Sequence, residues 1–148
     1  GVSGKLLRKT LEEVGLLPAT VYISNIVKVR PPDNRDPSPE EIAAFKPYLD
    51  REITLIQPKL IITLGRFSMA KFLPGVFISQ VHGRLHKVVW EDKPLYVLPM
   101  YHPAAALRSG SMKAAFLADF QKVPKILSWL AEQTKLHQEV EEVRAALL

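Results

Sequence analysis

Residues 59–65, Lys-Leu-Ile-Ile-Thr-Leu-Gly, constrain the fold of this chain more than any other segment. The run is apolar nearly throughout, which is typical of a central parallel strand covered on both faces. Such a strand requires helices on both sides of its sheet. The segment therefore favours a layered α/β domain.

The segments around it alternate between strand-like and helix-like patterns, as a layered α/β domain requires. Ser38-Pro39-Glu40-Glu41 has the features of a capping box that begins a helix. We expect helices at residues 5–14, 39–56 with a possible kink at Pro47, 66–73, and 111 to about 130 interrupted at Pro124. We expect strands at 21–27, 59–65 and 94–100, with 86–90 as a candidate hairpin partner of the last.

The composition excludes several kinds of site. The chain contains no cysteine, and its four histidines lack the spacing of metal ligands, so we expect no metal and no cofactor. No apolar run is long enough to span a membrane. The net charge of +5 favours polyanions such as nucleic acid, although many basic proteins bind none.

The two ends of the sequence differ from its body. The chain begins at Gly1 without an initiator Met, which suggests processing, a tag remnant or a missing N-terminal segment. At the other end, residues 135–148 place Leu136, Val140, Val143 and Leu147 at coiled-coil spacing. Packing on its own domain and binding a partner helix are equally compatible with that pattern. We divide the chain into a domain at 1–131 and a helical extension at 132–148.

Asn25 is a polar residue within an apolar run that we expect to be a strand. A buried amide needs hydrogen-bond partners, because an unsatisfied one costs roughly 1–3 kcal/mol. Asn25 therefore either bonds a neighbouring loop or forms the floor of a pocket for a flat ligand. Its one donor and one acceptor would match the N3–H and O4 of uracil.

His102 ends an expected strand, and ligands of open α/β sheets collect beyond the carboxyl ends of their strands. Pro103 favours an extended backbone at His102 and so helps to fix its direction. A histidine bonded to the backbone of a turn is the alternative.

The segment Arg108-Ser109-Gly110-Ser111 combines a cation and hydroxyls with the start of an expected helix, a combination suited to phosphate. A solvated connecting loop is the simpler interpretation. His82-Gly83-Arg84 is a second turn without a decisive feature.

Taken together, these segments resemble uracil-DNA glycosylases of the class that usually carries an iron–sulfur cluster. The resemblance covers residues 1 to about 127 and comes from motifs at several independent places. They are the run 22–28, Arg30-Pro31-Pro32, Asn34-Arg35, Pro39-Glu40-Glu41-Ile42, Pro47-Tyr48-Leu49, the run 58–65, His82-Gly83 and the run 99–105.

The resemblance implies a three-layer α/β/α sandwich around a four-stranded parallel sheet. It implies that Asn25 pairs with a flipped-out uracil and rejects cytosine, and that His102 donates to uracil O2 as the glycosidic bond breaks. It also implies that the loop 103–110 presses into the minor groove of DNA. The residues with an implied DNA contact are Pro103, Ala104, Arg108, Ser109 and Ser111.

The sequence departs from the family pattern in two respects. Val29 and Phe45 stand where cluster cysteines are common, so the family's cluster cannot form, and we expect these two apolar residues to pack together instead. The family's first strand, its water-positioning loop and its uracil-stacking Phe would precede Gly1. We therefore expect a fragment with little or no glycosylase activity by itself.

The sequence thus predicts a DNA-repair glycosylase that removes uracil from DNA by hydrolysis. An inactive or truncated DNA-binding module of the same fold is one alternative, and an α/β domain that binds a partner through residues 135–148 is another. The resemblance further implies a cytoplasmic, prokaryotic-type protein that joins the nucleoid during repair.

Overall fold

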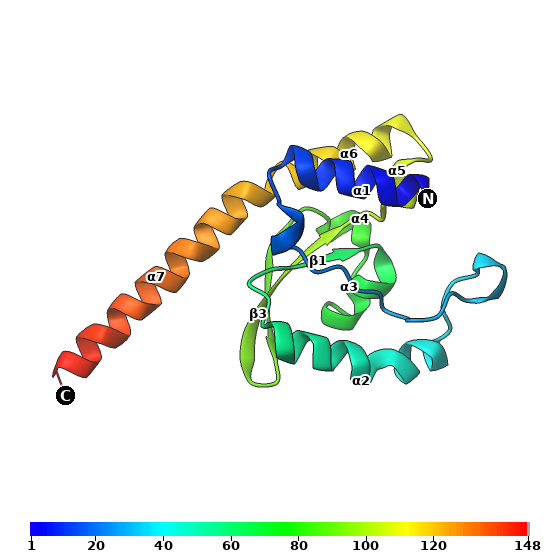
Figure 1. Cartoon of the computed structure of the whole chain (residues 1–148). Helices are drawn as coiled ribbons and strands as arrows, with labels where there is room; N and C mark the ends of the chain where they lie inside the picture. Colours follow the sequence, from blue (N-terminus) through cyan, green and yellow to red (C-terminus); the bar gives the residue numbers. More distant parts are fainter. Residues whose placement is uncertain (148) are drawn as a thin grey trace.

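A three-stranded mixed sheet forms the centre of the molecule (Figure 1). The computed structural model describes residues 1–147, except for the side chain of Asn34. The strands lie in the order β1 (Ile61–Leu64), β3 (Lys93–Met100) and β2 (His86–Trp90). β1 runs parallel to β3 and β2 antiparallel to it, so the expected hairpin is confirmed.

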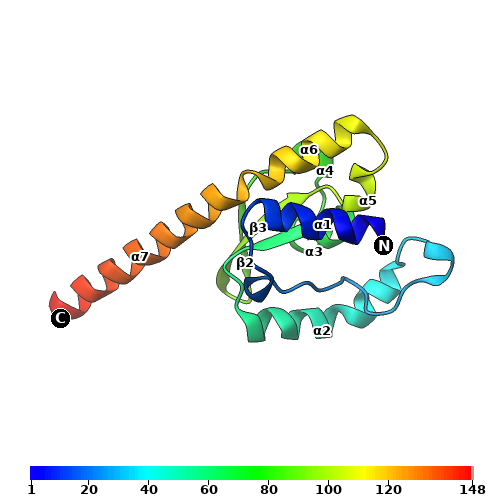
Figure 2. The same cartoon turned by 45° about the horizontal axis from the view of Figure 1, so that its top comes forward.

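Helices cover both faces of the sheet, which confirms the α/β class (Figures 1 and 2). One face carries α1 (Val2–Glu13), α5 (Pro103–Ala106) and α6 (Gly110–Phe120), and the other carries α2 (Pro39–Ile56) and α3 (Arg66–Phe72). Short elements occupy the connections, namely the 3-10 turns Pro18–Thr20 and Pro32–Asn34 and the helix α4 (Ile78–Val81). The last helix, α7 (Val123–Leu147), begins beside α6 and leaves the domain.

The main core lies between β3 and the helices α1, α5 and α6. Leu98 and Met100 of β3 pack with Phe116, Phe120 and Val123, and all five side chains are fully buried. Burying each such side chain stabilises the fold by about 1.5–3 kcal/mol. This core fixes the end of β3, from which the candidate site begins.

Two features of β3 show how the hairpin is accommodated. Pro99 lies past the end of β2, whose pairing stops at Val97, so its missing N–H interrupts no bond to β2. At the other end, Glu91 and Asp92 form the two-residue turn, and both have positive φ, 48° and 64°. Turns of that geometry favour Asn-Gly, so this turn carries local strain.

Residues 21–27 do not form a strand, and the expectation was wrong on this point. Residues 21–25 have no regular secondary structure and join no β-ladder in the part of the chain that the structure describes. β-branched residues favour a strand only where a neighbouring backbone accepts and donates hydrogen bonds. Side chains hold this segment to α2 instead.

The expected helix boundaries need one correction. Ser38 caps α2 through both bonds of a capping box, and α2 continues through Pro47. Pro124 does not interrupt a helix, because α6 ends at Phe120 and Pro124 is the second residue of α7. Proline fits that first turn because the N–H groups there have no partner within the helix.

α7 is continuous across the expected boundary between residues 131 and 132. Its first part is anchored by the buried Val123 and Leu130, whereas every residue from 131 to 147 is exposed. The extension therefore does not pack on its own domain. No helix among residues 1–147 has the length and apolar character of a membrane span.

Candidate active site

Asn25 lies in the extended segment that Glu52 of α2 holds in place. The Glu52 carboxylate accepts hydrogen bonds from Tyr22 Oη at 2.5 Å, Ser24 Oγ at 2.9 Å and Lys28 Nζ at 2.5 Å. Burial is the largest single influence on the pKa of Glu52 and raises it. The bonds from Lys28, Tyr22 and Ser24 together outweigh burial, so the pKa is lowered.

The Asn25 side chain is exposed, which corrects the view of it as a buried amide. Its backbone carbonyl accepts from Lys28 Nζ at 3.0 Å, while its side-chain amide bonds no other group among the described residues. It lines a cavity of about 180 Å³ between α2, α3 and β1, together with Thr63 and Ser68. The amide is thus free to pair with a ligand.

His102 follows β3 directly and caps α5. Its Nδ1 accepts the backbone N–H of Ala104 at 3.0 Å. In a neutral imidazole that bond assigns the proton to Nε2, so Nε2–H is the donor of the ring. Partial burial, followed by the positive charge of Arg108, lowers the pKa of His102 below its ordinary value of 6.5. At neutral pH the ring is therefore an uncharged hydrogen-bond donor.

Gly65 brings the carboxyl ends of β1 and β3 together. Its N–H donates to the carbonyl of Met100 at 2.9 Å, and its φ is +87°. A β-carbon at this position would lie 3.3 Å from the β-carbon of His102. The sequence signal for this contact is a glycine placed directly between an apolar strand and a helix.

Asn25 and His102 lie in different surroundings near β1. Asn25 shares its cavity with Ser68, whose hydroxyl donates to the carbonyls of Leu64 and Gly65. His102 touches Gly65 from the other side but does not line that cavity. The two residues therefore share no cavity in the part of the chain that the structure describes.

The loop after His102 presents most of the expected DNA contacts to solvent. Ala104, Arg108, Ser109 and Ser111 are exposed, whereas Pro103 is buried. Ser109 caps α6 by accepting from the N–H of Met112 at 3.1 Å, and its hydroxyl lies 3.2 Å from that of Ser111. The loop therefore offers a cation, two hydroxyls and a helix N-terminus close together.

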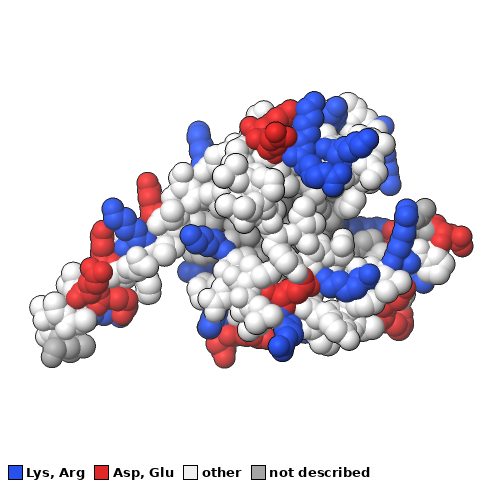
Figure 3. Space-filling model, in the orientation of Figure 1, with Lys and Arg blue, Asp and Glu red and all other residues white. Residues whose placement is uncertain are grey.

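α1 adds positive charge beside this loop, which the sequence did not indicate. α1 packs against α5 and α6, and its Lys5, Arg8 and Lys9 are exposed, as are Arg108 and Lys113. Figure 3 shows Lys and Arg side chains gathered over this end of the molecule. We refer to these five exposed cations on α1, the loop after α5 and α6 as the basic surface.

The pair His82 and Asp119 lies next to the residue that follows β3. His82 Nδ1 lies 2.6 Å from Asp119 Oδ2, and the His82 ring lies against Tyr101, with ring centroids 4.5 Å apart. A β-carbon at Gly83 would lie 2.1 Å from Asp119 Oδ1, so the turn requires glycine. The motif His82-Gly83 thus positions the residue that precedes His102.

The residues present do not fit an iron–sulfur cluster. The sequence contains no cysteine, and Val29 and Phe45 offer only hydrocarbon where the family often has a thiolate. The two side chains do not pack together as expected, because Val29 is 66% exposed and Phe45 lies against Tyr48.

The comparisons identify the family. Residues 1–131 match the model of the uracil DNA glycosylase superfamily, and the chain belongs to that superfamily. It is 41% identical over 132 residues to a type-4 uracil-DNA glycosylase of Sulfurisphaera tokodaii. The aligned region covers 85% of this chain and 60% of that protein. It is 42% identical over 134 residues to the type-4 enzyme of Saccharolobus solfataricus, with 86% and 62% covered.

A third relative has a different name. A DNA polymerase of Bacillus phage SP01 is 34% identical over 128 residues, which is 86% of this chain and 13% of that protein. The chain spans about 60% of the length of the two glycosylases.

Proposed function

We propose that this chain supplies uracil recognition and leaving-group stabilisation for hydrolysis of the N-glycosidic bond of deoxyuridine in DNA. The observation that carries the proposal is the bond from the Ala104 N–H to His102 Nδ1, which leaves Nε2–H of the neutral ring as a donor just after β3. The names of the two archaeal relatives support the same reaction.

His102 acts on the leaving group. As the bond between C1′ of the sugar and N1 of uracil breaks, its electron pair moves into the base, and negative charge gathers on O2. The Nε2–H of His102 donates to O2 and stabilises this charge. A water molecule adds to C1′, and its proton is released as the uracil anion departs.

Asn25 selects the base. Its amide oxygen accepts the N3–H of uracil, and its amide nitrogen donates to O4. Cytosine presents an acceptor at N3 and a donor at its exocyclic amine, so an Asn25 amide held in this orientation loses both bonds. A site built to hydrogen-bond a polar edge rejects the mismatched base strongly because its own polar groups would stay unpaired.

The basic surface binds the DNA backbone. Arg108, Ser109 and Ser111 contact phosphates beside the flipped nucleotide, and Ala104 faces the groove. Lys5, Arg8 and Lys9 add sequence-independent attraction. Pro103 is buried and acts by fixing the backbone at His102.

The test is cleavage of a uracil-containing oligonucleotide. The protein used is a chimera in which residues 1–131 replace the matching segment of the Sulfurisphaera tokodaii relative. We expect His102→Ala to lower the cleavage rate about a hundredfold or more, as for loss of a donor at developing charge. The matched control, His86→Ala, should keep the rate. Equal rates for both variants would overturn the proposal.

The alternative is a DNA-binding module without catalysis. The separation of His102 from the cavity that Asn25 lines favours this reading, as does the small share that the matching segment occupies in the phage polymerase. A chimera that binds uracil-containing DNA but releases no uracil would establish it.

A further inference from the structure

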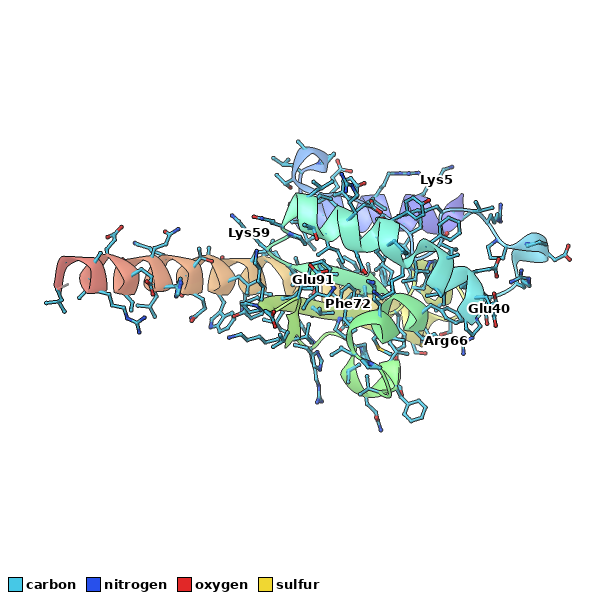
Figure 4. The ribbon with its side chains drawn as sticks, turned by 90° about the horizontal axis from the view of Figure 1, so that it is seen from below. Lys5, Glu40, Lys59, Arg66, Phe72 and Glu91 are labelled. Atoms are coloured by element: carbon cyan, nitrogen blue, oxygen red, sulfur yellow. The ribbon has the colours of Figure 1, made fainter. Side chains whose placement is uncertain are left out.

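α7 presents an unpartnered helical surface on the side of the molecule away from His102. Figures 1 and 2 show the helix projecting beyond the sheet, with α5 at the opposite end. Figure 4 shows side chains on all sides of its outer part and no other element beside it, while Glu40 and Arg66 mark the far end of the domain. Residues 131–147 span about 25 Å at 1.5 Å per residue.

An apolar seam follows this outer part of α7. Leu136, Val140, Val143 and Leu147 recur at steps of four, three and four residues and are 44–81% exposed. In a heptad they occupy alternating d and a positions. Trp129 has the same phase but already lies against Tyr96 of the domain, with centroids 6.1 Å apart. The free seam therefore begins at Gln133.

Charges flank the seam with a definite polarity. In the same heptad frame, Glu132 and Glu139 occupy g positions, and His137 and Arg144 occupy e positions. In a parallel pair of helices each g residue faces the e residue five positions later in the partner, so Glu139 meets Arg144 and Glu132 meets His137. An antiparallel pair would place like charges opposite each other.

We infer that α7 forms a parallel, in-register coiled coil with a second copy of this chain through Gln133, Leu136, Val140, Val143 and Leu147. Gln133 is the polar residue at an a position that fixes register and orientation. Among residues 1–147, the Arg144 side chain pairs with Glu141 of its own helix alone, at 3.4 Å between exposed side chains. An exposed pair of this kind is worth little, so Arg144 exchanges it readily for Glu139 of the second copy.

Anchoring makes so short a seam sufficient. Two heptads alone are marginal because helix nucleation is unfavourable. Here the helix is already formed from Val123, and the buried Val123 and Leu130 hold its start in the core. The second copy therefore meets a preformed surface, which removes most of the ordering cost of association.

The first test is sedimentation equilibrium of the full chain over a range of micromolar concentrations. We expect the mass to rise from 16.7 kDa toward twice that value. Val140→Glu should abolish the rise, and the matched control Gln138→Glu, on the opposite face, should keep it. A chain that stays monomeric, or a Val140→Glu variant that still dimerises, would overturn the inference. Unchanged melting of the domain would show that both variants fold.

A second test fixes the orientation and uses the absence of natural cysteine. Gln133→Cys should form an intermolecular disulfide on mild oxidation, because a positions meet their own copies in a parallel pair. Gln138→Cys should not. Crosslinking of Leu136→Cys with Leu147→Cys, a d position with an a position, would indicate antiparallel helices and contradict the inference. Equal crosslinking at 133 and 138 would show random collision and contradict it too.

Discussion

Gly65 and His102 are in such close contact that a β-carbon on the first would lie 3.3 Å from the β-carbon of the second. This contact ties the end of β1 to the residue that follows β3. It makes the position of the candidate catalytic ring depend on a residue that has no side chain.

Gly65→Ala should therefore destabilise the domain and displace His102. The φ of +87° costs about 1–3 kcal/mol for alanine, and the contact with His102 adds to it. Gly75→Ala is the matched control, since φ is +79° there and nothing lies within 4 Å of the added carbon. Urea denaturation measures the stability and the histidine NMR signals report the ring. Equal losses for both variants would show that the His102 contact is unimportant.

Arg108→Gln should raise the pKa of His102 toward 6.5. Partial burial lowers this pKa most, and the Arg108 cation lowers it further by disfavouring the charged ring. Because the ring must be neutral to keep its role, the acid limit of activity should move to higher pH in the variant. An NMR titration of His102 measures the shift, with Lys113→Gln as a control that leaves it in place. An unchanged titration of the Arg108 variant would contradict this prediction.

Glu52→Gln should loosen the segment that carries Asn25. The variant loses charge-assisted bonds from Lys28, Tyr22 and Ser24, and we expect a loss of about 1–3 kcal/mol in unfolding free energy. Because the folded-state pKa of Glu52 lies below 4.5, its contribution is complete above pH 4.5 and is lost as pH falls through the folded value. The difference from the parent should shrink accordingly in acid. Glu12→Gln, on the exposed surface of α1, should show no such difference.

Replacing the hairpin turn Glu91-Asp92 by Asn-Gly should stabilise the protein. Both residues have positive φ, which glycine and asparagine adopt with less strain. We expect a gain of about 1 kcal/mol in unfolding free energy, read from urea denaturation, without effect on the site at the other end of β3. A neutral or destabilising result would mean that the present side chains make contacts that offset the strain.

Local signals predicted much of this fold. The apolar run at 59–65 and the alternation around it gave the α/β class, and the capping box at Ser38 gave the start of α2. The run at 21–27 failed as a strand because pairing depends on a neighbour that local propensity does not report. Pro124 was expected to interrupt a helix, but it lies in the first turn of α7, where proline is tolerated as well.

In the candidate site too, residues with a local sequence pattern could be predicted, and residues with distant partners could not. His102 could be proposed from the sequence because it stands directly after a strand and before a proline, which is a local pattern. Glu52 was missed because its partners lie 24 to 30 residues earlier in the sequence. Only folding brings the surface of α2 to the segment 22–28, and no spacing rule connects them.

The continuity of α7 separates the outer helical surface from the candidate site. A single helix runs without a break from the core to a tip on the far side from α5. The proposed DNA-contacting loop and the proposed dimer seam therefore lie at opposite ends of the molecule and do not compete for surface. Substitutions in the outer half of α7 should change the proposed dimerisation and leave the proposed uracil release unchanged.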